Sequence, residues 1–164
     1  MSDLFTTNGI EIEAKETSGA IFDYKRQHRY WLWRFDKMEG RYIQYIGLNP
    51  STANETKNDP TITKLAMFTK TLGFDGFYMT NLFTYITPYP EQLEWRQDEP
   101  YRDVLRDIRQ KCKTVVVCWG NFQTHGRDRQ VTSMFPDALC FGKNQNGSPK
   151  HPLYLRHDTK LIKF

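Results

Sequence analysis

The segment 114–119, TVVVCW, limits the possible folds more than any other part of this chain of 164 residues. Its apolar and β-branched residues point to both faces of a strand, which is typical of a strand buried inside a sheet. The charged segment EPYRDVLRDIRQKC comes directly before it and has helical periodicity, with Val104, Leu105 and Ile108 on its apolar face. A buried strand that follows an amphipathic helix indicates a parallel sheet covered by helices.

The rest of the chain continues this alternation. Four more segments have the pattern of buried strands or of helices, namely the strands 76–83 and 138–142 and the helices 61–72 and 122–135. Residues 29–36 and 41–48 have strand periodicity and are separated by the turn-like KMEG, so we predict that they form a β-hairpin. We therefore expect the α/β class, as a three-layer α/β/α domain with a central, mainly parallel four-stranded sheet plus an N-terminal antiparallel hairpin.

The length and the even composition predict a single domain, 1–164, in which residues 1–28 form an N-terminal extension. The net charge of +4 and the aromatic content of 15% suit a partner that carries phosphates and flat rings, although many other soluble proteins share these values. No signal peptide and no apolar run of membrane-spanning length occurs, so we expect a cytoplasmic protein with no membrane partner.

The three cysteines are Cys112, Cys118 and Cys140, and no two of them form a C-x-x-C pair. All three lie in or beside apolar runs, which predicts buried, reduced thiols. We expect neither a metal site nor another cofactor.

Ligands of open α/β sheets bind beyond the carboxyl ends of the parallel strands. Four segments follow predicted strands and are expected to line one shared cleft, namely 49–60, 81–90, 119–127 and 142–155. In the first, GLNPST, Gly47 permits a close backbone approach and Pro50 fixes the turn that holds Asn49. Asn49 can hold a water molecule or a helix end there, and the alternative is an ordinary Asx-turn.

Two later motifs have the same placement. Asn81 in MTNLFTYITP follows a strand, and its amide offers a donor beside an acceptor, which suits the edge of a nucleobase. His151 in SPKHPLYLR precedes a proline and the apolar trio 153–155. For Asn81 the alternative is an amide that only satisfies local backbone groups. For the segment around His151 the alternative is a final strand that covers the sheet edge.

The three motifs together, G-x-N-P, T-N-hydrophobic and H-P-x-x-L, resemble the uracil-DNA glycosylase superfamily, especially its mismatch-specific and thymine-DNA branch. The longer pattern LNPSTAN…NDPTI…TNLF…WGN…HPLYL resembles a family catalogued as a domain of unknown function. The resemblance implies that Asn49 positions the attacking water and that Asn81 reads the flipped base. It also implies that His151 stabilises the leaving base or braces the sugar-phosphate, and that residues 153–155 form a wedge in the duplex.

The sequence departs from the superfamily at two positions. Ser51 follows the N-P dipeptide, where the relatives carry glycine or a bulky tyrosine that bars groups at the pyrimidine C5 position. The small Ser51 therefore predicts a pocket that admits a base substituted at C5. Leu153 replaces the serine of H-P-S, which removes the phosphate contact of that motif.

Asp59 is a further candidate for holding the water or capping the next helix, and we expect Gly47, Pro50, Ser51 and Phe83 to shape the base pocket together with Asn81. Further side chains are candidates for contacts with DNA, and each basic one is alternatively a solvated surface charge: Lys57, Arg127, Arg129, Lys143, Lys150, Leu153, Tyr154, Leu155 and Arg156.

These features predict a monomeric, monofunctional DNA glycosylase that flips out and excises a modified pyrimidine from double-stranded DNA and leaves an abasic site. The favoured substrate is hydroxymethylated or glucosylated cytosine in phage DNA, in an antiviral defence role. The alternatives are a uracil or thymine mismatch repair glycosylase, a hydrolase or transferase acting on free nucleotides, and a binder of modified DNA without catalysis.

Overall fold

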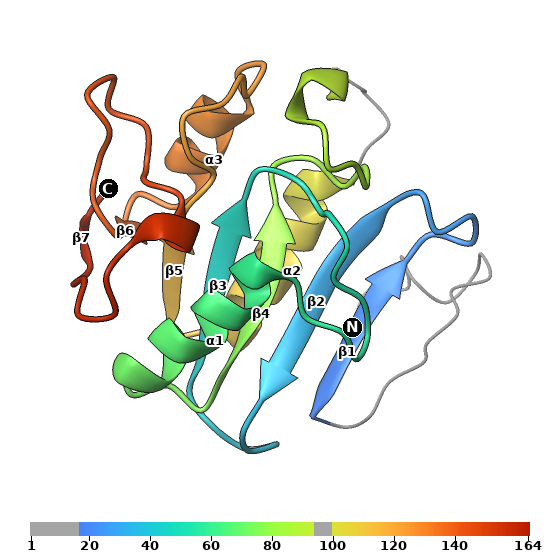
Figure 1. Cartoon of the computed structure of the whole chain (residues 1–164), viewed down its shortest axis with the longest axis vertical. Coiled ribbons are helices and arrows are strands. Elements are labelled where there is room, and N and C mark those ends of the chain that lie inside the picture. Colours follow the sequence, from blue (N-terminus) through green and yellow to red (C-terminus); the bar gives the residue numbers. More distant parts are fainter. Residues whose placement is uncertain (1–16, 94–99) are drawn as a thin grey trace.

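The computed structural model describes residues 17–93 and 100–164, and these residues form one seven-stranded sheet with helices on both faces (Figure 1). The sheet has the order β1-β2-β4-β3-β5-β6-β7, and its strands are β1 Ser18–Phe22, β2 Arg29–Phe35, β3 Tyr42–Gly47, β4 Gly76–Asn81, β5 Thr114–Val117, β6 Leu139–Cys140 and β7 Ile162–Lys163. The helices are α1 Pro60–Thr71, α2 Tyr101–Lys111 and α3 Arg127–Met134, with the 3₁₀ turns η2 Pro90–Gln92 and η3 Pro152–Tyr154. Of the predicted extension 1–28, residues 1–16 lie outside the described part of the chain.

The α/β class is confirmed, whereas the sheet is wider and more mixed than the predicted one. β3 pairs in parallel with β4 and β5, and β5 pairs in parallel with β6. The other three pairings between described strands, β1 with β2, β2 with β4 and β6 with β7, are antiparallel. β1, which lies within the predicted extension 1–28, and β7, near the end of the chain, are therefore the two outermost strands of the sheet.

The predicted hairpin of 29–36 with 41–48 is wrong, because β4 lies between β2 and β3. β3 is buried along almost its whole length, and it pairs with β4 on one side and with β5 on the other. The link between β2 and β3 bonds to Asp75, just before β4: Asp36 N donates to the Asp75 carbonyl at 2.7 Å, and Asp75 N donates to the Arg41 carbonyl at 2.9 Å. These bonds replace those of a tight hairpin turn.

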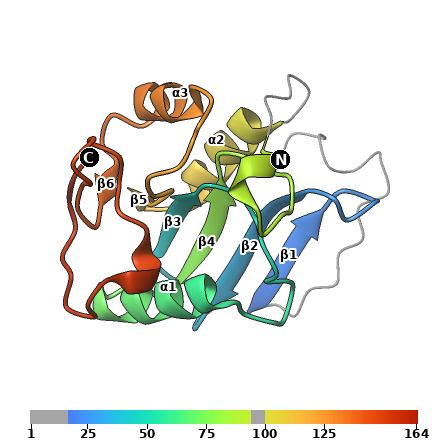
Figure 2. The ribbon, with the colours of Figure 1, turned by 45° about the horizontal axis from the view of Figure 1, so that its top comes forward.

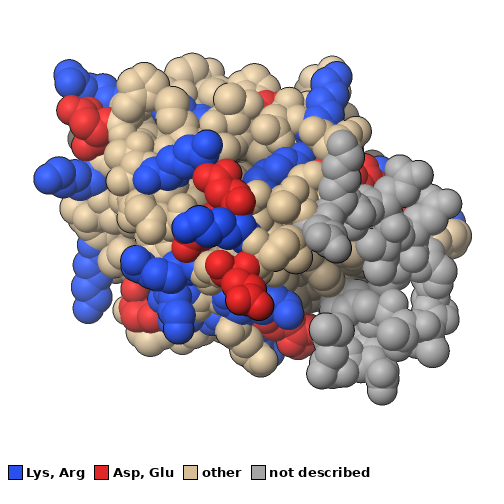
Figure 3. Space-filling view, turned by 90° about the horizontal axis from the view of Figure 1, so that it is seen from below, with Lys and Arg blue, Asp and Glu red and all other residues tan. Residues whose placement is uncertain are grey.

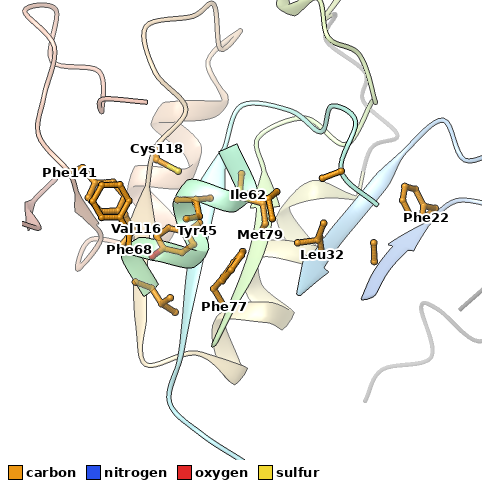
Figure 4. Close-up of a cluster of buried hydrophobic side chains, with 14 residues drawn as sticks. Phe22, Leu32, Tyr45, Ile62, Phe68, Phe77, Met79, Val116, Cys118 and Phe141 are labelled. Atoms are coloured by element: carbon orange, nitrogen blue, oxygen red, sulfur yellow. The ribbon is translucent and has the colours of Figure 1, made fainter. Parts of the chain in front are cut away.

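The helices cover opposite faces of the sheet, with α1 on one face and α2 and α3 on the other (Figures 1 and 2). Alternate residues of each central strand supply the two cores, as Tyr45 and Ile46 of β3 illustrate. Tyr45 packs on the α1 side with Phe68, Phe77 and other apolar side chains (Figure 4). The three cysteines are buried and unpaired, as expected.

The ends of the helices follow local signals in the sequence. Asp59 caps α1, because its Oδ1 accepts a hydrogen bond from Ile62 N at 2.8 Å, and Pro60 occupies the first helical position. α3 begins later than the predicted 122, because His125 and Gly126 have positive φ angles of 51° and 82°, which no α-helix accommodates. Among the described residues, no helix is long and apolar enough to cross a membrane.

The two ends of the parallel strands, where their carboxyl and amino termini lie, carry different kinds of surface. β3, β4 and β5 run in the same direction, so their carboxyl ends meet at one edge, at the top of Figure 1. The opposite edge, seen from below in Figure 3, carries basic and acidic side chains side by side. Ion pairs such as Lys37–Asp75 at 3.1 Å and Lys70–Asp36 at 3.6 Å belong to this mixed surface. A ligand site is therefore expected at the carboxyl ends of these strands.

Candidate functional site

A cavity of about 150 Å³ opens at the carboxyl edge of β3, β4 and β5. Each of the four segments predicted to line a cleft contributes to its wall, with Asn49 from the first, Asn81 from the second, Phe122 from the third and His151 from the fourth. A cavity of about 150 Å³ in a protein core holds one benzene molecule, so this space suits a single six-membered ring. The first turn of α1 and the start of β2 complete the wall.

The most unusual side chain of the cavity is Asn81, the last residue of β4. It is only 3% exposed, and neither its Nδ2 nor its Oδ1 has a hydrogen-bond partner among the described residues. Leaving a buried amide unpaired costs about 1–3 kcal/mol. An amide that is held in a cavity at such a cost is suited to bind a ligand that offers one acceptor and one donor.

Gly47 makes room for this amide, since it lies directly opposite Asn81 in the pairing of β3 with β4. A Cβ atom at position 47 would lie 2.9 Å from Oδ1 of Asn81 and 2.5 Å from Cε of Met79. Both distances are shorter than van der Waals contact, and the Asn81 side chain is enclosed. Gly47 therefore shapes the cavity by the absence of a side chain.

We expect Gly47→Ala to displace the Asn81 amide and to reduce ligand binding or turnover at least about tenfold, because misplaced polar groups lose their hydrogen bonds. Parallel thermal unfolding would show that the fold survives. The double variant Gly47→Ala/Met79→Ala is the control: it removes the contact with Met79 but not the one with Asn81, so it should stay impaired. Full recovery in the double variant would show that Asn81 is not the affected group.

Asn49 is held in one orientation just beyond β3. Its Nδ2 donates to the carbonyl of Thr87 at 2.7 Å and to that of Pro50 at 2.9 Å. Thr87 N also donates to the Pro50 carbonyl, at 3.1 Å, which ties the loops after β3 and β4 together. Oδ1 of Asn49 is thus left as an acceptor at the cavity. Pro50 itself is buried and does not line the cavity, so its expected place in the base pocket is wrong and it acts through the loop.

His151 and Asp59 lie on the same wall. Nδ1 of His151 accepts a hydrogen bond from Leu153 N at 3.3 Å, which places the proton of the neutral ring on Nε2. Burial lowers the pKa of His151, against the opposing effect of the Asp59 charge, so the ring is neutral at pH 7. Oδ1 of Asp59 caps α1, and the carboxylate also lines the cavity. The pair supplies a neutral donor and a negative charge.

Sequence reasoning missed Arg29 and Phe122. Arg29 is the first residue of β2, lines the cavity and is only 2% exposed, although its neighbours in sequence resemble a solvent-exposed strand start. Phe122 lines the cavity with a ring that is 48% exposed. An exposed aromatic ring after a central strand is a signal for a ligand site, whereas a buried arginine has no signature in a single sequence.

The predicted DNA contact of Arg127 and the predicted place of Phe83 in the base pocket are wrong. Arg127 is fully buried, so it cannot reach DNA. Its Nη1 donates to the Leu82 carbonyl at 2.7 Å, and its guanidinium lies 4.3 Å from the ring centre of Phe83 and 4.2 Å from that of Tyr101. Phe83 belongs to the core on the α2 side and does not line the cavity, because β4 ends at Asn81 and both Leu82 and Phe83 pack into that core. Arg127 and Phe83 stabilise the face of the sheet behind the site.

The predicted wedge, residues 153–155, lies in and just after the 3₁₀ turn η3. Tyr154 is 89% exposed, Leu153 is half-buried, and Leu155 packs against the core on the α1 side. Leu155 is therefore not available for insertion, and Tyr154 is the side chain that projects. The remaining predicted basic residues are all exposed, although Arg156 pairs with Asp158 at 3.1 Å: Lys57, Arg129, Lys143, Lys150 and Arg156.

The fold and the cavity define an α/β protein with a ring-sized pocket, lined by both polar and apolar side chains, at the carboxyl ends of its parallel strands. Residues 29–153 match the family described as "Protein of unknown function (DUF1643)", and the chain belongs to this family. The match includes every residue of the cavity wall, from Arg29 to His151. No curated protein and no solved structure matches the chain significantly. No group of three or more metal-ligating side chains occurs among the described residues.

Proposed function

We propose that this protein is a monofunctional DNA glycosylase that excises a modified pyrimidine and leaves an abasic site. The single observation that carries the proposal is the buried Asn81 amide at the wall of a ring-sized cavity, whose donor and acceptor both lack partners in residues 17–93 and 100–164. The edge of a pyrimidine supplies an acceptor and a donor on neighbouring atoms, at the spacing of one amide. The motifs shared with the uracil-DNA glycosylase superfamily support the same assignment.

The proposed reaction breaks the bond between C1′ of the sugar and the ring nitrogen, and the electron pair of this bond stays on the base. Water adds to C1′ and loses one proton, and the base gains one. The transition state resembles an oxocarbenium ion. Oδ1 of Asn49 orients the water, the charge of Asp59 stabilises the positive sugar, and Nε2 of His151 donates to the departing base. No lysine lines the cavity in the described part of the chain, in keeping with hydrolysis by water.

The small side chain of Ser51 supports a base that is substituted at C5. Ser51 lines the cavity next to Asn49, where a bulky side chain would fill space. Hydroxymethylated and glucosylated cytosine carry such substituents in phage DNA, so we propose an antiviral role. Exposed Tyr154 and the nearby basic side chains would offset the few kcal/mol needed to flip a nucleotide out of the duplex.

The proposal is tested with genomic DNA from phages that contain normal, hydroxymethylated or glucosylated cytosine, together with uracil-containing DNA. Abasic sites are counted with an aldehyde-reactive probe, and the Asn49→Ala variant is the negative control. We expect abasic sites on one DNA with bulky C5 groups and none with the variant. Strong excision of plain uracil alone would reject the proposed substrate, and no abasic sites on any DNA would reject the glycosylase itself.

A further inference from the structure

The wall of the cavity contains a buried cation that the proposed reaction has not used. Arg29 is 2% exposed, and Nη1 donates to the carbonyl of Ala53 at 2.9 Å. No group among the described residues accepts a hydrogen bond from Nε. A guanidinium has five N–H groups and no acceptor, so a buried one with an unpaired Nε is suited to bind an oxygen atom of a ligand.

Within the described part of the chain, Asp59 is the acidic side chain whose charge acts on Arg29, and Arg34 adds a like charge. No ion pair between Arg29 and a described carboxylate occurs within 4 Å. Burial lowers the pKa of Arg29 to about 10, so the group remains protonated at neutral pH. The other titratable groups of the wall are His151, which is neutral, and Cys118, whose pKa burial raises to about 12. An isolated buried cation favours an anionic ligand.

Cleavage of an N-glycosidic bond creates this kind of ligand. As the C1′–N bond breaks, its electron pair moves onto the base, and the negative charge spreads over the ring nitrogen and the adjacent carbonyl oxygen. The sugar becomes positive at the same time. Arg29 and Asp59 place opposite charges on one cavity wall, which complements the two ends of the breaking bond.

We propose that Arg29 is a further catalytic residue, which donates to the carbonyl oxygen beside the glycosidic nitrogen and stabilises the base as an anion. This inference rests on the proposed function and adds to it: the pocket binds the anionic form of a pyrimidine more tightly than the neutral form. Asn81 would bind the remaining edge of the same ring.

The test uses calorimetric titration of the full chain with free uracil and with 5-fluorouracil, which ionises under mildly alkaline conditions where Arg29 stays charged. We expect wild-type affinity for 5-fluorouracil to rise with pH as the ring ionises. Arg29→Gln should lose this rise and bind the anion at least about tenfold more weakly, whereas Arg29→Lys keeps part of it. Arg127→Gln is the matched control, because Arg127 is equally buried but lies outside the cavity.

A second measurement separates this inference from the proposed function. On the DNA that yields abasic sites, Arg29→Gln should lower the single-turnover rate about 10²–10³-fold. The loss should be smaller on DNA in which 5-fluorocytosine replaces that base, because a better leaving group needs less stabilisation. Anion-selective binding without any excision would reject the glycosylase and keep Arg29 as an anion site. No binding, or equal pH dependence in wild type and Arg29→Gln, would overturn the role of Arg29 whether or not a base is excised.

Discussion

Replacing Asn81 by leucine is expected to make the protein more stable and, at the same time, inactive. Leucine has nearly the shape of asparagine but no polar atoms, so it removes a buried donor and a buried acceptor that no described residue pairs with. The free energy of unfolding should rise by about 1–3 kcal/mol, the cost of leaving such a group unpaired. Urea denaturation measures this change without any assumption about the substrate.

The activity of the same variant should fall about 10²–10³-fold, since the amide is the proposed contact with the base. Asn144→Leu is the matched control, because the Asn144 amide donates to Ser148 Oγ at 3.0 Å and to the Pro149 carbonyl at 3.3 Å. That substitution should lower stability and leave excision unchanged. If Asn81→Leu instead destabilised the protein as Asn144→Leu does, the Asn81 amide would have a structural partner, and its assignment to a ligand would fail.

The positions of Asn49 and Asn81 could be predicted from sequence because they depend on local rules. Each follows an apolar run that is long enough for one buried strand, and parallel strands bring their carboxyl ends to one edge. The helical pattern of 61–72 likewise predicted α1, which spans Pro60–Thr71 and buries Ile62, Leu65 and Phe68. Local patterns sufficed where one strand or one helix determines the placement of a residue.

The pairing of the strands could not be predicted in the same way. A short polar link between two strand patterns favours a hairpin. Here the link bonds to Asp75, which is 34 positions beyond Arg41, and β4 inserts between the two strands. The register of a sheet depends on contacts between distant segments, and a single sequence does not record them.

Arg29 and Arg127 likewise show that a single sequence does not reveal which charged side chains are buried. Arg29 and Arg127 are both buried, yet each stands in a charged stretch that resembles a solvent-exposed surface. Arg127 fills a space between two aromatic rings on the α2 side, and Arg29 reaches a cavity on the α1 side. Only the tertiary fold separates a structural guanidinium from one that can meet a ligand.

Asn49→Ala is expected to slow excision about 10²–10⁴-fold, the range associated with the groups that position or activate the attacking water. The two hydrogen bonds of Nδ2 hold the Asn49 side chain still, so that Oδ1 remains fixed at the cavity. Alanine removes this acceptor and leaves the Asn81 amide in place. Binding of DNA that already contains an abasic site should therefore change little, and single-turnover kinetics should show the loss in the chemical step.

Asn54→Ala provides the control for this prediction. Asn54 lies in the same loop, and its Oδ1 accepts from Thr56 N at 3.1 Å and Lys57 N at 2.8 Å, but it does not line the cavity. Its loss should loosen the loop with only a small effect on the rate. Equal losses in both variants would mean that the loop as a whole, rather than the Asn49 amide, limits catalysis. A slow Asn49→Ala protein beside a nearly normal Asn54→Ala protein would instead assign the water to Asn49, because only the cavity-facing acceptor distinguishes the two.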